Sequence, residues 1–281
     1  MLIFTKISDL RAFLTQKKNE HKTLGFVPTL GALHPGHTSL IERSKQQCDV
    51  TICSIFVNPT QFNDKKDLER YPRMPEKDIQ LLEKAGCDAV FLPTTEEIYP
   101  TPGKEIFNFG YLSSTLEGEH RPGHFNGVAQ VVKRFFLIIE PDKAFFGSKD
   151  YQQVMIIKAL VKQMHSKIEI IACPILREAD GLAMSSRNAL LNAEERATAA
   201  LLPKIMKQAN DLLKNEGLEP AKSFVHSQIV ANPLMKLDYY EVCTAGDLKI
   251  VSQLDPGVEY VAVIACFVGR IRLIDNLPVA L

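Results

Sequence analysis

Short apolar runs alternate with helical periodicity along the first 175 residues, and this alternation constrains the fold more than any other feature of the sequence. Five runs that close at proline, glycine or asparagine are typical of buried strands, at residues 23–28, 50–59, 89–93, 142–147 and 168–174. Between them, apolar residues recur at steps of three and four, at residues 38–47, 75–85, 127–139 and 151–164. Strand and helix in alternation predict parallel βαβ units in a Rossmann-like α/β sheet, with any site in the loops that follow the strands.

The pattern changes after residue 175. A polar stretch, READGLAMSSRN, precedes helical runs at residues 193–215, interrupted at Pro203, and at residues 220–230. Strand-like runs follow at residues 235–245, 258–268 and 270–276, and Gly269 separates the last two as a hairpin turn would. We therefore expect two domains, a ligand-binding Rossmann-like domain at residues 1–175 and a smaller α+β lid domain at residues 176–281.

Charge and cysteine usage exclude several classes of protein. The 33 basic and 33 acidic side chains balance, so no overall field draws nucleic acid or an anionic membrane. The longest apolar run, residues 260–268, is shorter than the roughly 20 residues that span a bilayer. Six cysteines without a CxxC pair indicate reduced, buried thiols rather than disulfides or a zinc site. We expect a soluble, cytoplasmic protein that acts on small molecules.

Two histidines three residues apart lie where the first of these strands passes into a helix, in PTLGALHPGHTSL. Gly31 and Gly36 allow the backbone to approach a ligand closely, and Thr38 is expected to begin a helix whose N-terminus favours an anion. His34 and His37 would then stabilise negative charge on a phosphoryl group. Two alternatives stay open: one histidine caps the helix, or the pair binds a metal, although no third ligand lies in this segment.

Three further segments carry polar groups suited to phosphates or carboxylates. Lys149 in FFGSKDYQQV is a point charge for a phosphate, with Gln153 four residues on. Gln61 in FVNPTQF offers an amide that both donates and accepts. AMSSRN supplies two hydroxyls and a guanidinium for a polyphosphate. Each could be a turn or a surface side chain when taken alone, but four such segments together favour a ligand site.

HPGH on a strand-to-helix turn resembles the HxGH signature of the nucleotidyltransferase superfamily, and AMSSRN resembles its flexible phosphate-binding motif. Together with SIFVNPTQF, EGEHRPGHFNGV and DKAFFGSKDYQQV, in this order, they resemble the pantoate–β-alanine ligase (pantothenate synthetase) family over residues 28–190. The resemblance implies an ATP-dependent carbon–nitrogen ligase that forms pantothenate, the precursor of coenzyme A. In such an enzyme (R)-pantoate attacks the α-phosphorus of Mg²⁺-bound ATP, giving pantoyl adenylate and pyrophosphate, and β-alanine then displaces AMP.

The resemblance also implies roles for individual residues and a homodimer. His37 would be the proton donor, with His34 beside it on the phosphates. Gln61 and Gln153 would bind pantoate, Gln61 would border β-alanine, and no protein ligand of Mg²⁺ is implied. The catalytic set would be His34, His37, Lys149, Ser185, Ser186 and Arg187. The ATP-binding set would be Leu30, Gly31, Ala32, Leu33, His34, Pro35, Gly36, His37, Gly147, Ser148, Lys149, Asp150, Leu176, Met184, Ser185, Ser186 and Arg187.

The sequence departs from the family's usual motifs at four positions. Leu30 and Thr60 stand where methionine is common, Ser148 where glutamate is common and Asn126 where arginine is common. These changes leave the reaction class intact and bear on nucleotide affinity and metal placement. Three alternatives stay open: a nucleotidyltransferase that keeps AMP or CMP on its product, a nucleotide-binding regulatory module, and an RNA-binding synthetase-like protein, which the even charge balance disfavours.

Overall fold

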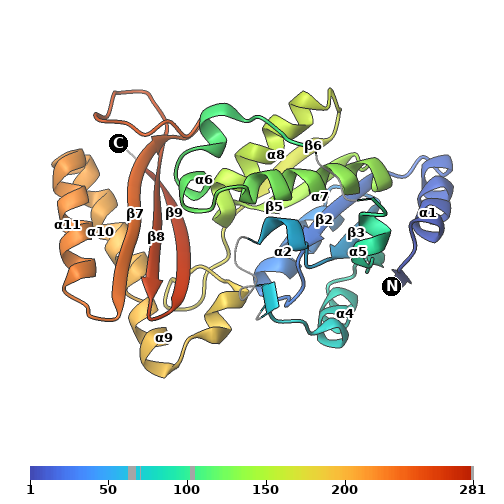
Figure 1. Ribbon diagram of the computed structural model, residues 1–281, viewed down its shortest axis with the longest axis horizontal. Coiled ribbons are helices and arrows are strands. Elements are labelled where there is room, and N and C mark those ends of the chain that lie inside the picture. Colours follow the sequence, from blue (N-terminus) through green and yellow to red (C-terminus); the bar gives the residue numbers. More distant parts are fainter. Residues whose placement is uncertain (63–67, 70, 102–104, 280–281) are drawn as a thin grey trace. The chain divides into compact units, whose positions relative to one another are not determined.

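The computed structural model describes residues 1–62, 68–69, 71–101 and 105–279 (Figure 1). Contacts between residues divide the chain into two compact units. The first consists of Met1–Ser148 and Gln152–Pro174, and the second of Lys149–Tyr151 and Ile175–Leu281.

A six-stranded parallel sheet forms the centre of the first unit, in the order β1-β4-β3-β2-β5-β6. β2 pairs with β3, where Leu24 lies opposite Val50, and with β5, where Gly25 lies opposite Lys143. The strand order reverses at β2, and in parallel sheets such a switch point opens a crevice at the carboxyl ends of the strands. The predicted α/β fold class is confirmed. The strands are β1 (Leu2–Phe4), β2 (Leu24–Thr29), β3 (Val50–Ile55), β4 (Ala89–Phe91), β5 (Lys143–Gly147) and β6 (Glu169–Cys173).

Helices cover both faces of this sheet. Phe26 and Ile52 pack into a core with α1, α7 and α8, whereas the neighbouring Val27 and Cys53 pack into a second core with α2 and α4. Because successive strand residues point to opposite faces, burial on both sides explains the continuous apolar strands (Figure 1). The long helices are α1 (Ile7–Asn19), α2 (Pro35–Lys45), α4 (Pro75–Lys84), α7 (His124–Ile139) and α8 (Tyr151–Gln163). The short ones are η1 (Pro59–Gln61), α5 (Thr95–Ile98), η2 (Gly110–Ser113), α6 (Glu117–His120) and η3 (Ser148–Asp150).

The second unit pairs helices with a three-stranded antiparallel sheet in the order β7-β8-β9. Its core lies between α10, α11 and the strand face that includes Val242 and Ile264. The predicted hairpin is confirmed: β8 and β9 are antiparallel, and Gly269 has a φ of +56° between them. The predicted helical run at residues 193–215 is two helices, because the second begins with Pro203 in its first turn. The elements are η4 (Ser186–Leu190), α9 (Ala193–Ala199), α10 (Leu202–Asn215), α11 (Leu218–Val230), β7 (Met235–Thr244), β8 (Tyr260–Val268) and β9 (Ile271–Val279).

Candidate active site

The loop between β2 and α2, residues 30–37, carries both predicted histidines and is called the histidine loop below. Gly31 and Ala32 both have a positive φ, +84° and +51°. The helix begins at Pro35, not at Thr38 as predicted, because proline has the fixed φ that suits a first helical position. The hydroxyl of Thr38 therefore lies inside the first turn and donates to the Pro35 carbonyl at 3.1 Å.

His34 caps α2, which is one of the alternatives left open by the sequence. Its Nδ1 accepts the Gly36 N–H at 3.2 Å, and its own N–H donates to His37 Nδ1 at 3.3 Å. The two rings lie 4.1 Å apart between centroids. Because each Nδ1 accepts a hydrogen bond, each neutral ring carries its proton on Nε2. Each imidazole thus carries an Nε2–H donor close to the N-terminus of α2, and donors at a helix N-terminus suit an anion.

Gln61 ends η1, the short helix that follows β3, and a buried amide fixes its orientation. Asn58 is fully buried, and its Nδ2 donates to Gln61 Oε1 at 3.2 Å and to the Gly127 carbonyl at 3.1 Å. Tyr99 donates its hydroxyl to Asn58 Oδ1 at 2.9 Å, and burial raises the pKa of Tyr99, so the phenol remains a donor at neutral pH. Because Gln61 Oε1 is occupied by Asn58, the Gln61 amide offers a ligand its two N–H donors.

The N-terminus of α7 supports the same short helix. His124 is buried, with Nδ1 2.8 Å from the Gln61 carbonyl oxygen and Nε2 3.1 Å from Arg121 Nη1. A guanidinium only donates, so Nε2 accepts and Nδ1–H donates to Gln61. Gly127 allows this close packing, because a Cβ there would lie 2.2 Å from the Thr60 carbonyl oxygen.

Gly147 ends β5 and leads through η3 into α8. Lys149 lies in η3, directly before α8, and its Nζ is 3.9 Å from Asp150 Oδ1. Gln153 is half-buried on the first turn of α8. The neighbouring Gln152 is buried and accepts the Glu117 N–H at 3.0 Å, which ties α6 to α8.

The remaining predicted residues lie in the second unit. Leu176 and Met184 face each other in a small hairpin, where the Met184 N–H donates to the Leu176 carbonyl at 3.0 Å. Ser185 caps η4 by accepting the Arg187 N–H at 3.3 Å, the turn that the sequence left open as an alternative. Ser186 follows as the first residue of η4.

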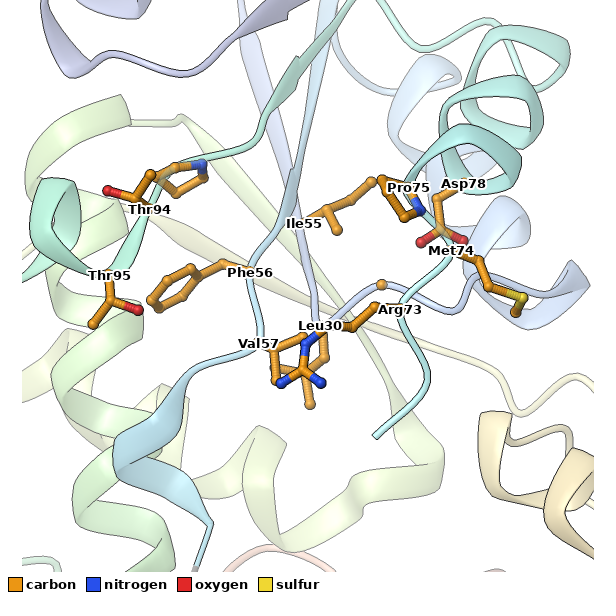
Figure 2. Close-up of a pocket in the computed structure, with 12 residues that line it drawn as sticks. Leu30, Ile55, Phe56, Val57, Arg73, Met74, Pro75, Asp78, Thr94 and Thr95 are labelled. Atoms are coloured by element: carbon orange, nitrogen blue, oxygen red, sulfur yellow. The ribbon is translucent and has the colours of Figure 1, made fainter. Parts of the chain in front are cut away.

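A pocket of about 330 Å³ opens at the carboxyl ends of β2, β3 and β4. Figure 2 shows Leu30, Val57 and the guanidinium of Arg73 near its centre, with Asp78 on one side and Thr94 on the other. The pocket thus lies beside the histidine loop, since Leu30 and Gly31 line it.

The structure therefore brings the predicted residues of the first unit to neighbouring strand ends. The histidine loop follows β2, Gln61 follows β3 and Gly147 ends β5, and β3, β2 and β5 are adjacent. Sequence analysis missed the buried Asn58, Asp78 and His124 as functional candidates. Asn58 and His124 lie in quoted motifs, whereas Asp78 resembles any first-turn acid of a helix.

No group of three or more His, Cys, Asp or Glu side chains that could hold a metal ion occurs in the described part of the chain. Mg²⁺ delivered with ATP would take most of its ligands from phosphates and water and would not need such a group. No helix within the described ranges has the length and apolar character needed to cross a membrane.

Comparison with known proteins settles the family. The family model described as Pantoate-beta-alanine ligase matches residues 2–278. The chain belongs to the pantoate–β-alanine ligase family. The pantothenate synthetase of Porphyromonas gingivalis is 46% identical over 277 residues, which cover 99% of each chain. The crystal structure of pantothenate synthetase from Thermus thermophilus superposes with a TM-score of 0.93 at 37% identity, covering 100% of both chains.

A third relative of the pantoate–β-alanine ligase family was solved with ligands. The structure of the Francisella tularensis ligase, described as complexed with beta-gamma ATP and beta-alanine, has a TM-score of 0.83 to this chain at 37% identity. It covers 99% of this chain, and this chain covers 97% of it. The predicted recognition of the family is confirmed.

Proposed function

We propose that this chain condenses (R)-pantoate with β-alanine to form pantothenate, with cleavage of ATP to AMP and pyrophosphate through an enzyme-bound pantoyl adenylate. The observation that carries the proposal is similarity over the whole chain to pantothenate synthetases, including one described with ATP and β-alanine bound. The phosphate-compatible groups at adjacent strand ends support it.

In the proposed first step, a pantoate carboxylate oxygen bonds to the α-phosphorus of ATP, and the bond from that phosphorus to the bridging oxygen of pyrophosphate breaks. Negative charge grows on the phosphate oxygens during this step. The Nε2–H groups of His34 and His37, the N-terminus of α2 and the ammonium of Lys149 would offset this charge. His37 would also be the proton donor. Mg²⁺, when bound, would neutralise further phosphate charge.

The residues proposed to bind ATP are the histidine loop, Gly147–Asp150, Leu176 and residues 184–187. In this proposal the first unit is the nucleotide- and pantoate-binding domain and the second is the lid. The hydroxyls of Ser185 and Ser186 and the guanidinium of Arg187 would bind phosphate oxygens.

Pantoate would be held by Gln61 and Gln153. The two N–H donors that Asn58 leaves on Gln61 suit an acceptor such as the pantoate carboxylate or a hydroxyl. In the second step the β-alanine amine, bordered by Gln61, bonds to the acyl carbon, AMP leaves with the electrons of the acyl–oxygen bond, and the nitrogen releases a proton to water. Alignment supplies most of the rate, because an acyl adenylate is already reactive toward an amine.

The first test is release of pyrophosphate and AMP from MgATP by the purified protein, with pantoate alone and then with β-alanine added. We expect sustained release of pyrophosphate and AMP only when pantoate and β-alanine are both present, with pantothenate as the product. A nucleotide left on the product would favour the nucleotidyltransferase alternative. ATP binding without pyrophosphate release in any mixture would favour the regulatory module.

Substitution tests the assigned roles. His37→Ala and Lys149→Ala should each lower kcat/KM roughly a hundredfold, because each would remove a donor to the phosphates. This factor corresponds to a loss of about 3 kcal/mol of transition-state stabilisation. The matched controls are His226→Ala on α11 and Lys158→Ala on α8, which remove the same side chains from exposed helix positions. Near-normal turnover in either test variant would remove that residue from the catalytic set.

We further propose a Mg²⁺ requirement and a homodimer, which the family resemblance implies, and a cytoplasmic location, which the sequence predicts. Titration of activity with a chelator and then with Mg²⁺ tests the first prediction. Sedimentation equilibrium of the purified protein tests the second.

A further inference from the structure

We propose that Asp78 is a positioning residue for His34 and His37, acting through the backbone of the histidine loop. Asp78 lies in the first turn of α4, and its side chain points toward the loop that follows Leu30 (Figure 2). It is only 1% exposed, although it carries a carboxylate. The inference rests on the proposed function, because it concerns the geometry of the same phosphate site.

Both oxygens of this carboxylate accept backbone hydrogen bonds from the histidine loop. Oδ2 accepts the Ala32 N–H at 2.9 Å, and Oδ1 accepts the Leu33 N–H at 2.7 Å. Hydrogen bonds to a charged acceptor are stronger than neutral ones, and the positive end of α4 further offsets the buried charge. Asp78 therefore fixes the two residues immediately before His34.

The loop needs such a brace because its backbone is strained. Ala32 has a φ of +51°, which a residue with a Cβ rarely adopts. Gly31, at +84°, has no room for a side chain, since a Cβ there would lie 3.1 Å from Asp78 Oδ2. The hydrogen bonds to Asp78 hold Ala32 and Leu33 in this conformation.

Every backbone N–H from residue 31 to residue 34 is directed to a side-chain acceptor. The Gly31 N–H donates to Thr29 Oγ1 at 3.3 Å, the next two donate to Asp78, and the His34 N–H donates to His37 Nδ1. Successive hydrogen bonds to Thr29 of β2 and Asp78 of α4 thus fix the backbone that leads to the two imidazoles. Loss of the Asp78 bonds would leave both rings in place but less well aligned with the phosphates.

The test variant is Asp78→Asn, which keeps the shape but turns one acceptor into an amide that faces an N–H donor. The matched control is Asp88→Asn. Asp88 also holds a backbone N–H with its carboxylate, from Thr51 at 2.7 Å, and pairs with Lys45 at 2.9 Å, but it lies at the amino ends of the strands. Pyrophosphate release with saturating MgATP and varied pantoate is measured below the melting temperature of each variant.

We expect Asp78→Asn to lower kcat for pyrophosphate release at least tenfold with the pantoate KM changed less than threefold, because small misplacements of catalytic groups lower rates steeply. Asp88→Asn should lower the melting temperature while kcat stays within twofold. A kcat for Asp78→Asn within twofold of the parent protein would overturn the proposal, as would equal losses of kcat in both variants.

Two further measurements keep the test decisive. If Asp78→Asn does not fold, Asp78→Ser replaces the two carboxylate acceptors by one hydroxyl and should lower kcat about fivefold, and a kcat within twofold of the parent protein would refute the positioning role. Imidazole NMR signals of His34 and His37 should shift in Asp78→Asn and not in Asp88→Asn, and this readout needs no activity. If the parent protein has no ligase activity but the signals still shift in Asp78→Asn, the proposed function is refuted and the positioning role stands. Signals that do not shift in Asp78→Asn would refute the positioning role.

Discussion

Gly127→Ala tests whether close packing of α7 against η1 sets the geometry of the proposed pantoate site. The added Cβ would lie 2.2 Å from the Thr60 carbonyl oxygen and 2.7 Å from the Gln61 Cα. Comfortable contact needs about 3.5 Å, so the two backbones must separate by about 1 Å. That shift would also stretch the 3.1 Å bond from Asn58 to the Gly127 carbonyl.

The structure predicts a small loss of stability and a large loss of activity. Overpacking costs about 1–3 kcal/mol, and the higher helix propensity of alanine returns about 1 kcal/mol. A net loss of about 1 kcal/mol lowers the melting temperature by about 2–4 °C in a unit of this size. A displacement of about 1 Å can lower a reaction rate about a hundredfold, and here it moves Gln61.

The assay combines thermal melting with pyrophosphate release at varied pantoate concentrations. The matched control is Gly246→Ala, where an added Cβ meets nothing within 4 Å and the φ is not positive. The control should leave both melting temperature and kinetics close to those of the parent protein. A Gly127→Ala protein with parental kinetics would show that the spacing between α7 and η1 does not matter for pantoate.

Two further predictions concern an ion pair and the thiols. Asp275→Ala should lower the free energy of unfolding of the second unit in urea by about 3 kcal/mol, because it removes the buried carboxylate that lies 2.7 Å from Arg177 Nη1. The control is Asp211→Ala at an exposed position, which should change stability by less than about 0.5 kcal/mol. Burial raises the pKa of Cys87, Cys243 and Cys266 to about 12, so no thiol of these three should react quickly with a disulfide reagent at pH 8 in the native protein. Their raised pKa values contribute stability that is complete below the unfolded pKa near 9 and is lost as the pH rises toward 12. Fast reaction without denaturant would contradict the burial.

The central strands could be predicted from the sequence, whereas the first strand and helix could not. Burial on both faces gives β2 and β3 continuous apolar runs, which stand out between their turn residues. β1 has only three residues, and Leu2 and Ile3 are half-exposed at the sheet edge, so no pattern marks it. α1 buries little beyond Leu10 and Leu14, and such a sparse stripe is a weak helical signal.

The candidate site divides in the same way. His34 and Gln61 could be found from the sequence because local motifs at strand ends contain them. Asp78 could not, because its hydrogen bonds reach residues 45 and 46 positions earlier in the chain, and no local pattern encodes that distance. A buried side chain that bonds to distant backbone can be identified only once the structure shows its hydrogen-bond partners.

Two of the four departures from the family's motifs, Thr60 and Asn126, make side-chain hydrogen bonds near the proposed pantoate site. Thr60 donates its hydroxyl to Asn58 Oδ1 at 3.0 Å, and Asn126 accepts the Phe107 N–H at 2.9 Å and donates to the Glu105 carbonyl. Both side chains thus bind within the first unit. A hydroxyl bound to Asn58 reinforces the amide that orients Gln61, so Thr60 adds to the rigidity of the proposed pantoate site, where methionine would add only volume. Since Leu30 and Ser148 lie in the proposed ATP site, any effect of the departures on nucleotide affinity should come from these two positions before Thr60 and Asn126.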